Sequence, residues 1–258
     1  MEATELAVLM LCICGIGTFL YGTRSPIHGL PLLQSTKSAF MGIVVAIATL
    51  LIIRSPFGRR TGAHFNPALT LTYFCLGRVH PWDAVGYITA QFAGGVAGVF
   101  VAHQIFCTNL AAFPVRYVIT IPGPFGVTAA LVAEFIMSYS LMYVVLFASN
   151  HRRLRELSPL LVALLTVFYY TFGSSISGYS VNPARSFSSA LFACIWQGIW
   201  IYFLAPCLGM LTAAASYTRM RGKHRVYCAK VFHDQYSICP FQCAFDRVIR
   251  DGVYHMDR

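Results

Sequence analysis

Six long apolar segments dominate this chain of 258 residues. They lie near residues 4–21, 38–53, 82–106, 127–149, 159–176 and 197–217. Most of them approach the length of about 20 apolar residues that a helix needs to cross a bilayer. The composition agrees, because 57% hydrophobic and 11% charged residues are too apolar a mixture for a soluble domain of this size. The sequence therefore predicts an all-α membrane protein with six transmembrane helices.

Basic residues are concentrated in the connectors after the second, fourth and sixth segments. These are Arg54, Arg59, Arg60 and Arg78, then Arg152, Arg153 and Arg155, then Arg219, Arg221, Lys223 and Arg225. The opposite connectors hold Arg24, Lys37 and Arg116. The positive-inside rule then predicts that both termini are cytoplasmic. The net charge of +10 is thus explained by topology and does not indicate a nucleic-acid partner.

The N-terminus, Met1-Glu2-Ala3-Thr4-Glu5, lacks the basic region that precedes the apolar core of a signal peptide. We therefore expect the first segment to remain in the mature protein. The short N-terminus and the lack of targeting signals favour a bacterial inner membrane.

The chain carries an internal repeat. Glu5 lies in the first apolar segment and Glu134 in the fourth, and each half then contains an Asn-Pro-Ala motif after a glycine-containing loop. Because each half has three spans, the second half enters the membrane from the opposite side. This is an inverted repeat, an arrangement common in transport proteins. We expect a first repeat over residues 1–110, a second over 127–220 and a cytoplasmic tail over 221–258.

The two motifs are Asn66-Pro67-Ala68 and Asn182-Pro183-Ala184. Asn is a favoured N-cap and Pro a favoured first helical residue, so each motif predicts the start of a helix. The apolar runs that follow, 69–76 and 187–193, are too short to cross a bilayer. They are interpreted as re-entrant half-helices, and non-helical backbone at membrane depth is tolerated where it is buried or lines a wet cavity. The pair therefore predicts a pore.

The paired motifs, the six spans and the two intramembrane glutamates resemble the aquaporin, or major intrinsic protein, family over residues 4 to about 220. The resemblance is to bacterial-type members of the water-channel branch. It implies a homotetramer with one single-file pore per subunit that passes water passively and excludes protons and ions. An enzyme is not expected, because the spans offer no nucleophile and base, paired carboxylates or metal site at a convincing spacing.

The resemblance also implies roles for individual residues. Glu5 and Glu134 would accept hydrogen bonds from the backbone of the re-entrant loops. The carbonyls that line the pore map onto Gly62, Ala63, His64, Gly178 and Ser180. The narrowest constriction, the selectivity filter, maps onto Ile43, Tyr170, Tyr179 and Arg185 by distance from the motifs.

The two Asn side chains indicate how the pore would bind a passing water molecule. If Asn66 and Asn182 cap the half-helices with their oxygens, each amide NH2 is free to donate into the pore. The half-helix N-termini place partial positive charge at the centre, which opposes protons and other cations.

The filter departs from the patterns that the family resemblance leads us to expect. Water-selective members typically carry His where this chain has Tyr170, and glycerol-conducting members carry a small residue at one filter site. Ser186, Ala190 and the pair Tyr202-Phe203 favour the water branch. We therefore expect water as the permeant, with ammonia, hydrogen peroxide and glycerol as alternatives.

The tail falls outside the resemblance and contains Cys228, His233, Cys239 and Cys243. Three thiolates and an imidazole suit tetrahedral zinc, although the spacing lacks a Cys-x2-Cys knuckle. The alternative is a basic tail on acidic lipids with incidental cysteines. A metal-binding tail that gates the pore is a further hypothesis. Conduction itself requires no cofactor.

Overall fold

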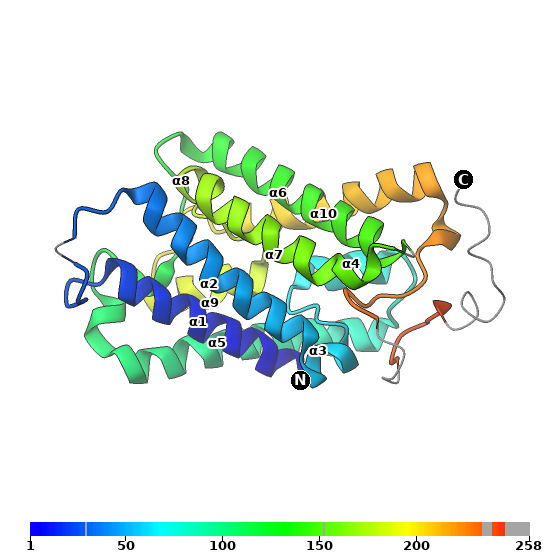
Figure 1. Ribbon diagram of the computed structural model, residues 1–258, viewed down its shortest axis with the longest axis horizontal. Helices are drawn as coiled ribbons and strands as arrows, with labels where there is room; N and C mark the ends of the chain where they lie inside the picture. Colours follow the sequence, from blue (N-terminus) through cyan, green and yellow to red (C-terminus); the bar gives the residue numbers. More distant parts are fainter. Residues whose placement is uncertain (29, 152, 234–238, 246–258) are drawn as a thin grey trace.

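The computed structural model describes residues 1–28, 30–151, 153–233 and 239–245. Six apolar helical segments are long enough to cross a membrane. They are α1 (Glu2–Tyr21), α2 (Gln34–Arg54), α5 (Pro81–Ala111), α6 (Gly126–Ser149), a composite fifth segment, and α10 (Ile201–Arg221). Strands are absent from the described residues. The predicted all-α fold with six spans is confirmed, and Figure 1 shows the long helices lying side by side.

The fifth span is composite. It begins as α7 (Ser158–Phe168), passes through a π-helical turn, η3 (Tyr169–Gly173), and ends as α8 (Ser174–Ser177). The turn adds a residue to the helical repeat at the point where Tyr169 and Tyr170 face the interior, and both are buried. The connecting elements are α3 (Pro56–Thr61), η1 (Arg116–Val118), η2 (Arg155–Leu157) and η4 (Lys223–Arg225).

Glycines let equivalent helices in the two halves approach closely. A Cβ added to Gly94 or Gly98 of α5 would lie 2.1 Å from the Ala3 carbonyl oxygen or 2.4 Å from that of Ala7, both in α1. In the second half, a Cβ on Gly209 of α10 would lie 2.5 Å from a carbonyl oxygen of α6. The α1–α5 and α6–α10 pairs therefore pack backbone against backbone.

Two short helices begin inside the protein, α4 (Pro67–Cys75) and α9 (Pro183–Ala193). The Asn66 side-chain oxygen accepts from Ala68 N at 3.0 Å, which caps α4. The Asn182 oxygen accepts from Ala184 N at 3.1 Å and from Arg185 N at 3.2 Å, which caps α9. Each Pro occupies the first turn, where its missing N–H leaves no helical hydrogen bond unmade.

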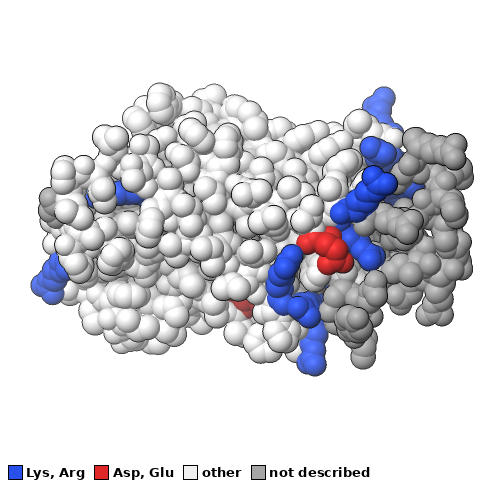
Figure 2. Space-filling view, in the orientation of Figure 1, with Lys and Arg blue, Asp and Glu red and all other residues white. Residues whose placement is uncertain are grey.

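After α10 the chain folds back against one end of the helical bundle (Figure 1). Figure 2 shows most of the Lys and Arg side chains on this face gathered toward that end, with few at the opposite end. A broad belt between the two ends carries no Lys or Arg on this face. This is the surface that a bilayer-spanning protein needs, with Lys and Arg confined to the two aqueous ends.

Candidate functional site

A cavity of about 70 Å³ lies between the two halves, next to the N-termini of α4 and α9. Its apolar walls include Leu9, Ile13 and Val45. Its polar lining comes from Asn66 and Asn182 and from Tyr170, Tyr179 and Arg185. The cavity therefore joins the two Asn-Pro-Ala motifs to most of the predicted filter.

The Asn side chains join the two half-helices to each other. Nδ2 of Asn66 donates to the Val181 carbonyl at 2.8 Å, and Nδ2 of Asn182 donates to the Phe65 carbonyl at 2.7 Å. The prediction that each amide group is wholly free was therefore wrong, since one N–H of each is used across the repeat. An amide carries two N–H donors, so one per Asn is left to face the cavity.

The loops before the motifs adopt backbone conformations that L-residues rarely occupy. Ala63 and Phe65 have φ of 55° and 31°, and the corresponding residues Tyr179 and Val181 have φ of 47° and 49°. Strained backbone of this kind persists only where surrounding contacts hold it, and it gathers at functional sites. Both loops therefore need external support.

Carboxylates supply this support. Glu134 accepts from Ser180 N at 2.9 Å, Val181 N at 2.7 Å and the Ser177 hydroxyl at 2.7 Å. This contact has the form that the family resemblance implied.

In the first half, Glu2 and not Glu5 accepts from the loop backbone, at 3.0 Å from His64 N and 2.7 Å from Phe65 N. Glu5 accepts instead from the Thr61 hydroxyl at 2.7 Å. Sequence reasoning missed Glu2 because it precedes the apolar segment in which a buried carboxylate attracts attention.

Tyr170 and Tyr179 stand edge to face, with ring centroids 4.6 Å apart. Arg185 lies beside them and is 3% exposed, and among the described residues its Nη1 has no hydrogen-bond partner. A buried guanidinium N–H without a protein partner is costly unless it faces an acceptor in the cavity. These three residues therefore give the cavity a polar part of its lining.

The fourth predicted filter residue, Ile43, was placed wrongly. It is 45% exposed on the outer face of α2 and is not part of the cavity lining. Gly42 lies against Tyr170 instead, where an added Cβ would be 2.8 Å from the Tyr170 Cβ. A shift of one residue turns a helical side chain by about 100°, which explains how a small alignment error moves a residue from one face to another.

The residues predicted to line the pore with their carbonyls differ in whether they border the cavity. Tyr179 and Ser180 border the cavity. Gly178 has φ of 78° and begins the strained loop. Gly62, Ala63 and His64 lie outside the cavity lining, on the side of Asn66 that faces the tail.

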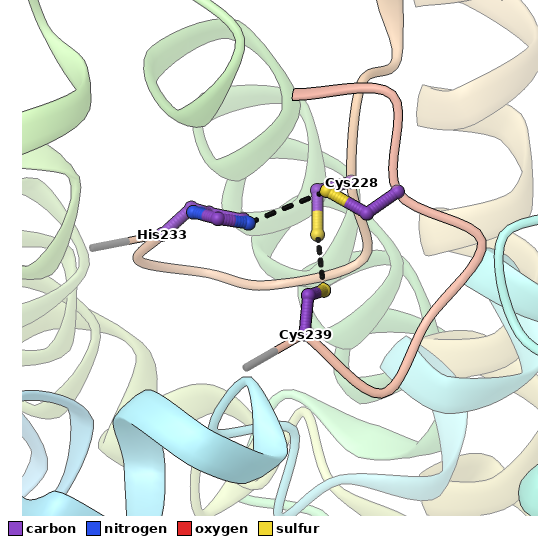
Figure 3. A group of neighbouring side chains, drawn as sticks. Cys228, His233 and Cys239 are labelled. Carbon is purple, nitrogen blue, oxygen red and sulfur yellow. Dashed lines mark hydrogen bonds between the residues drawn. The ribbon is translucent and has the colours of Figure 1, made fainter. Parts of the chain in front are cut away.

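The tail brings together Cys228, His233, Cys239 and Cys243, called here the tail group. Its ligand atoms all lie within 4.8 Å of one another. The Cys228 and Cys239 sulfurs are 3.4 Å apart, and the Cys243 sulfur is 3.3 Å from Nε2 of His233. Figure 3 shows the side chains of Cys228, His233 and Cys239 converging. Such a set of donors could hold a metal ion.

Contacts within and around the tail group favour the binding of a cation. Thiol hydrogen bonds from Cys228 and Cys243 lower the pKa of Cys239. Phe245 N donates to the Cys243 sulfur at 3.4 Å, and the Phe245 ring stacks on His233 at 4.2 Å. A thiolate is the form of Cys that binds metal, and outer contacts of this kind orient the ligands.

Two facing half-helices inside an inverted repeat of membrane helices define a helical membrane channel. A model of the Major intrinsic protein family matches residues 2–217. Aquaporin NIP2-1 from Zea mays is 33% identical over 222 residues, which cover 85% of this chain and 70% of that protein. Putative aquaporin NIP4-1 from Arabidopsis thaliana is 35% identical over 192 residues, which cover 70% of this chain and 63% of that protein.

Among solved structures, an aquaglyceroporin from Plasmodium falciparum matches with a TM-score of 0.67 at 20% identity. The match covers 84% of this chain and 92% of that one. The chain belongs to the major intrinsic protein family and is an integral membrane channel, not an enzyme. The sequence relatives named here are plant proteins, so the bacterial inner membrane stays a prediction.

Proposed function

We propose that the chain is a water channel with a single-file pore in each subunit. The observation that carries the proposal is the cavity beside the N-termini of the half-helices, which is lined by Asn66, Asn182 and Arg185. Its volume of about 70 Å³ is large enough to hold water. Water can accept from the free amide N–H groups and donate to loop carbonyls.

Exclusion of ions follows from the same geometry. The N-termini of α4 and α9 meet at the Asn residues, and each contributes about half an elementary positive charge. Arg185 adds a full positive charge to the cavity lining. A cation that has shed its hydration shell to enter is therefore repelled at two places, whereas a neutral molecule is not.

The Tyr170–Tyr179 pair supports a preference for water over larger solutes, because both bulky rings line the cavity. The second candidate is a channel for small neutral solutes such as glycerol, ammonia or hydrogen peroxide. The names of the relatives, aquaporins and an aquaglyceroporin, are compatible with either candidate.

The test compares water and glycerol entry into proteoliposomes by stopped-flow light scattering. The chain is freed of metal with a chelator before reconstitution, so that the state of the tail group is fixed. We expect rapid shrinkage in an impermeant osmolyte, negligible glycerol entry, and glycerol entry gained by Tyr170→Gly. Tyr170→Phe keeps the ring and serves as the matched control, which should exclude glycerol. Glycerol entry as fast as water in the native chain would favour the second candidate.

We also infer the arrangement of the chain in the membrane. It is a homotetramer of the two repeats, 1–110 and 127–220, with the tail 221–258 and both termini in the cytoplasm. The basic end in Figure 2 supports this orientation. Large apolar side chains exposed on the helices, such as Ile47, Leu51 and Phe100, support burial against lipid or a neighbouring subunit.

We further propose that the tail group binds zinc. Zn–S bonds of about 2.3 Å in a tetrahedron place ligand atoms about 3.8 Å apart, which is close to the separations of the tail group. Cysteines on the cytoplasmic side are expected to be reduced, which favours a metal over a disulfide. Elemental analysis of the purified chain should find one zinc per chain in the native protein and none in Cys239→Ser. Cys75→Ser, at an exposed cysteine of α4, is the matched control.

A further inference from the structure

The tail packs directly on the loop that precedes the first Asn-Pro-Ala motif. Val231 N donates to the Gly62 carbonyl at 3.0 Å. The Ala229 carbonyl lies 2.7 Å from Nε2 of His64. On the other side of the imidazole, the Phe241 ring stacks on His64 with centroids 5.3 Å apart and planes at 2°. The tail thus hydrogen-bonds to the Gly62 carbonyl, which was predicted to line the pore, and holds the imidazole of His64 in place.

These contacting residues are interleaved with the ligands of the tail group. The stretch 229–231 lies between Cys228 and His233, and Phe241 lies between Cys239 and Cys243. A metal ion that joins all four ligands would therefore fix both contacting stretches at once. Loss of the ion would leave each stretch attached through its own weak contacts alone, because a structural metal site supplies the folding energy of a small segment.

Lys230 connects the tail group to the loop electrostatically. Its side chain is 1% exposed, and its ammonium donates to the Arg59 carbonyl, near the C-terminal end of α3, at 2.5 Å. Lys230 also interacts electrostatically with Cys239. A buried ammonium is costly unless it is paired, and zinc held by three thiolates and a neutral imidazole carries a net negative charge. The loaded tail group would therefore carry a charge opposite to that of this buried lysine.

The tail also covers the approach to the cavity from the cytoplasmic side. In the described part of the chain, the cavity lining reaches Phe65 and Asn66 and includes none of residues 62–64. Ala63 and His64 are each 1% exposed. Ala63 packs in one apolar cluster with Ala229, Val231 and other tail residues. The loop is thus buried under the tail where a conducting pore needs a path to water.

We propose that the metal-loaded tail is a plug that restricts the cytoplasmic end of the pore and that loss of the metal releases it. This inference rests on the proposed water channel and on the proposed zinc site. The metal acts by holding the tail on the loop and takes no part in conduction. Zinc availability on the cytoplasmic side would then set the permeability of the channel.

The experiment measures osmotic shrinkage of proteoliposomes that contain the full chain, with zinc content measured on the same samples. Three states are prepared under a reducing agent before reconstitution: as purified, after removal of metal with a chelator, and after reloading with zinc sulfate. Phe241→Ala removes the ring from His64 and keeps all four ligands. Met220→Ala, at a residue that is 70% exposed in α10, is the matched control.

We expect removal of zinc to raise water permeability several-fold and reloading to reverse the change. Phe241→Ala should be fast with zinc still bound, and Met220→Ala should follow the native chain. Equal rates in the loaded chain, the stripped chain and Phe241→Ala would overturn the plug and leave the zinc site and the channel standing. A chain that contains no zinc as purified and takes up none on reloading would overturn the zinc site, and the plug with it. Rates no faster than empty liposomes in every state would overturn the channel and the plug together.

Discussion

At the scale of single residues, Glu134 explains how a strained loop is kept at membrane depth. Its two oxygens accept from two consecutive backbone N–H groups of the second loop, Ser180 N and Val181 N. Neither donor can reach water from a buried loop, so each would otherwise be left unsatisfied. The carboxylate costs free energy to bury, and the hydrogen bonds offset that cost.

Glu134→Gln should destabilise the folded chain. The Gln side chain has one accepting oxygen and an NH2 group that cannot accept, so at least one donor loses its partner, at a cost of about 1–3 kcal/mol. The thermal unfolding midpoint in detergent should fall. Glu156→Gln, whose side chain is 62% exposed, is the control and should leave the midpoint unchanged. An unchanged midpoint in Glu134→Gln would contradict the support role.

The structural roles of individual residues could be predicted from the sequence where a local rule applies. The caps at Asn66 and Asn182 follow from the chemistry of Asn and Pro at helix starts, and the structure shows both caps. The positions of Ile43 and Glu2 depend on how a helix is rotated about its axis and on which loop lies across from it. Those are tertiary properties, and a count of residues along the chain does not contain them.

At the scale of elements, the α1–α5 contact is set by small residues. Gly94 and Gly98 lie one turn apart on α5 and leave the α1 backbone within reach. Close backbone approach strengthens helix association in lipid, where there is no hydrophobic drive between helices.

Gly98→Ala should therefore weaken the fold. The added methyl group would sit 2.4 Å from the Ala7 carbonyl oxygen, and overpacking of this kind costs about 1–3 kcal/mol. Gly86→Ala in the same helix is the matched control, because a Cβ there meets nothing within 4 Å. The stability of both variants can be compared by thermal unfolding in detergent. Equal stability of the two variants would show that the helices can separate without loss.

The helical elements themselves were largely predictable, because each span is long and apolar. The π-helical turn Tyr169–Gly173 was not, since local propensity gives no signal for one extra residue within a helix. The short stretch of α5 beyond Cys107, where φ of 47° and ψ of -129° interrupt the helix, was also missed. Its last turn carries polar residues such as Asn109 and lies past the apolar run that defined the predicted span.

At the scale of the whole molecule, two halves of opposite orientation place two positive helix ends face to face at one cavity. The repeat, the charge asymmetry and the tail ligands could be predicted from the sequence because each is a local pattern. The packing of the tail on residues 62–64 could not, because it joins segments more than 160 positions apart, as in the His64–Ala229 contact.

The central claim is that water crosses each subunit through the cavity beside Tyr170 and Asn66. The most direct measurement is the osmotic shrinkage rate of proteoliposomes with the metal-free native chain, Val45→Trp and Ile43→Trp. Val45 lines the cavity and Ile43 faces outward, so only the first indole would fill the passage. If water takes this path, shrinkage should be fast for the native chain and Ile43→Trp, and should fall to a rate near that of empty liposomes for Val45→Trp. A fast Val45→Trp variant, or a native chain no faster than empty liposomes, would contradict it.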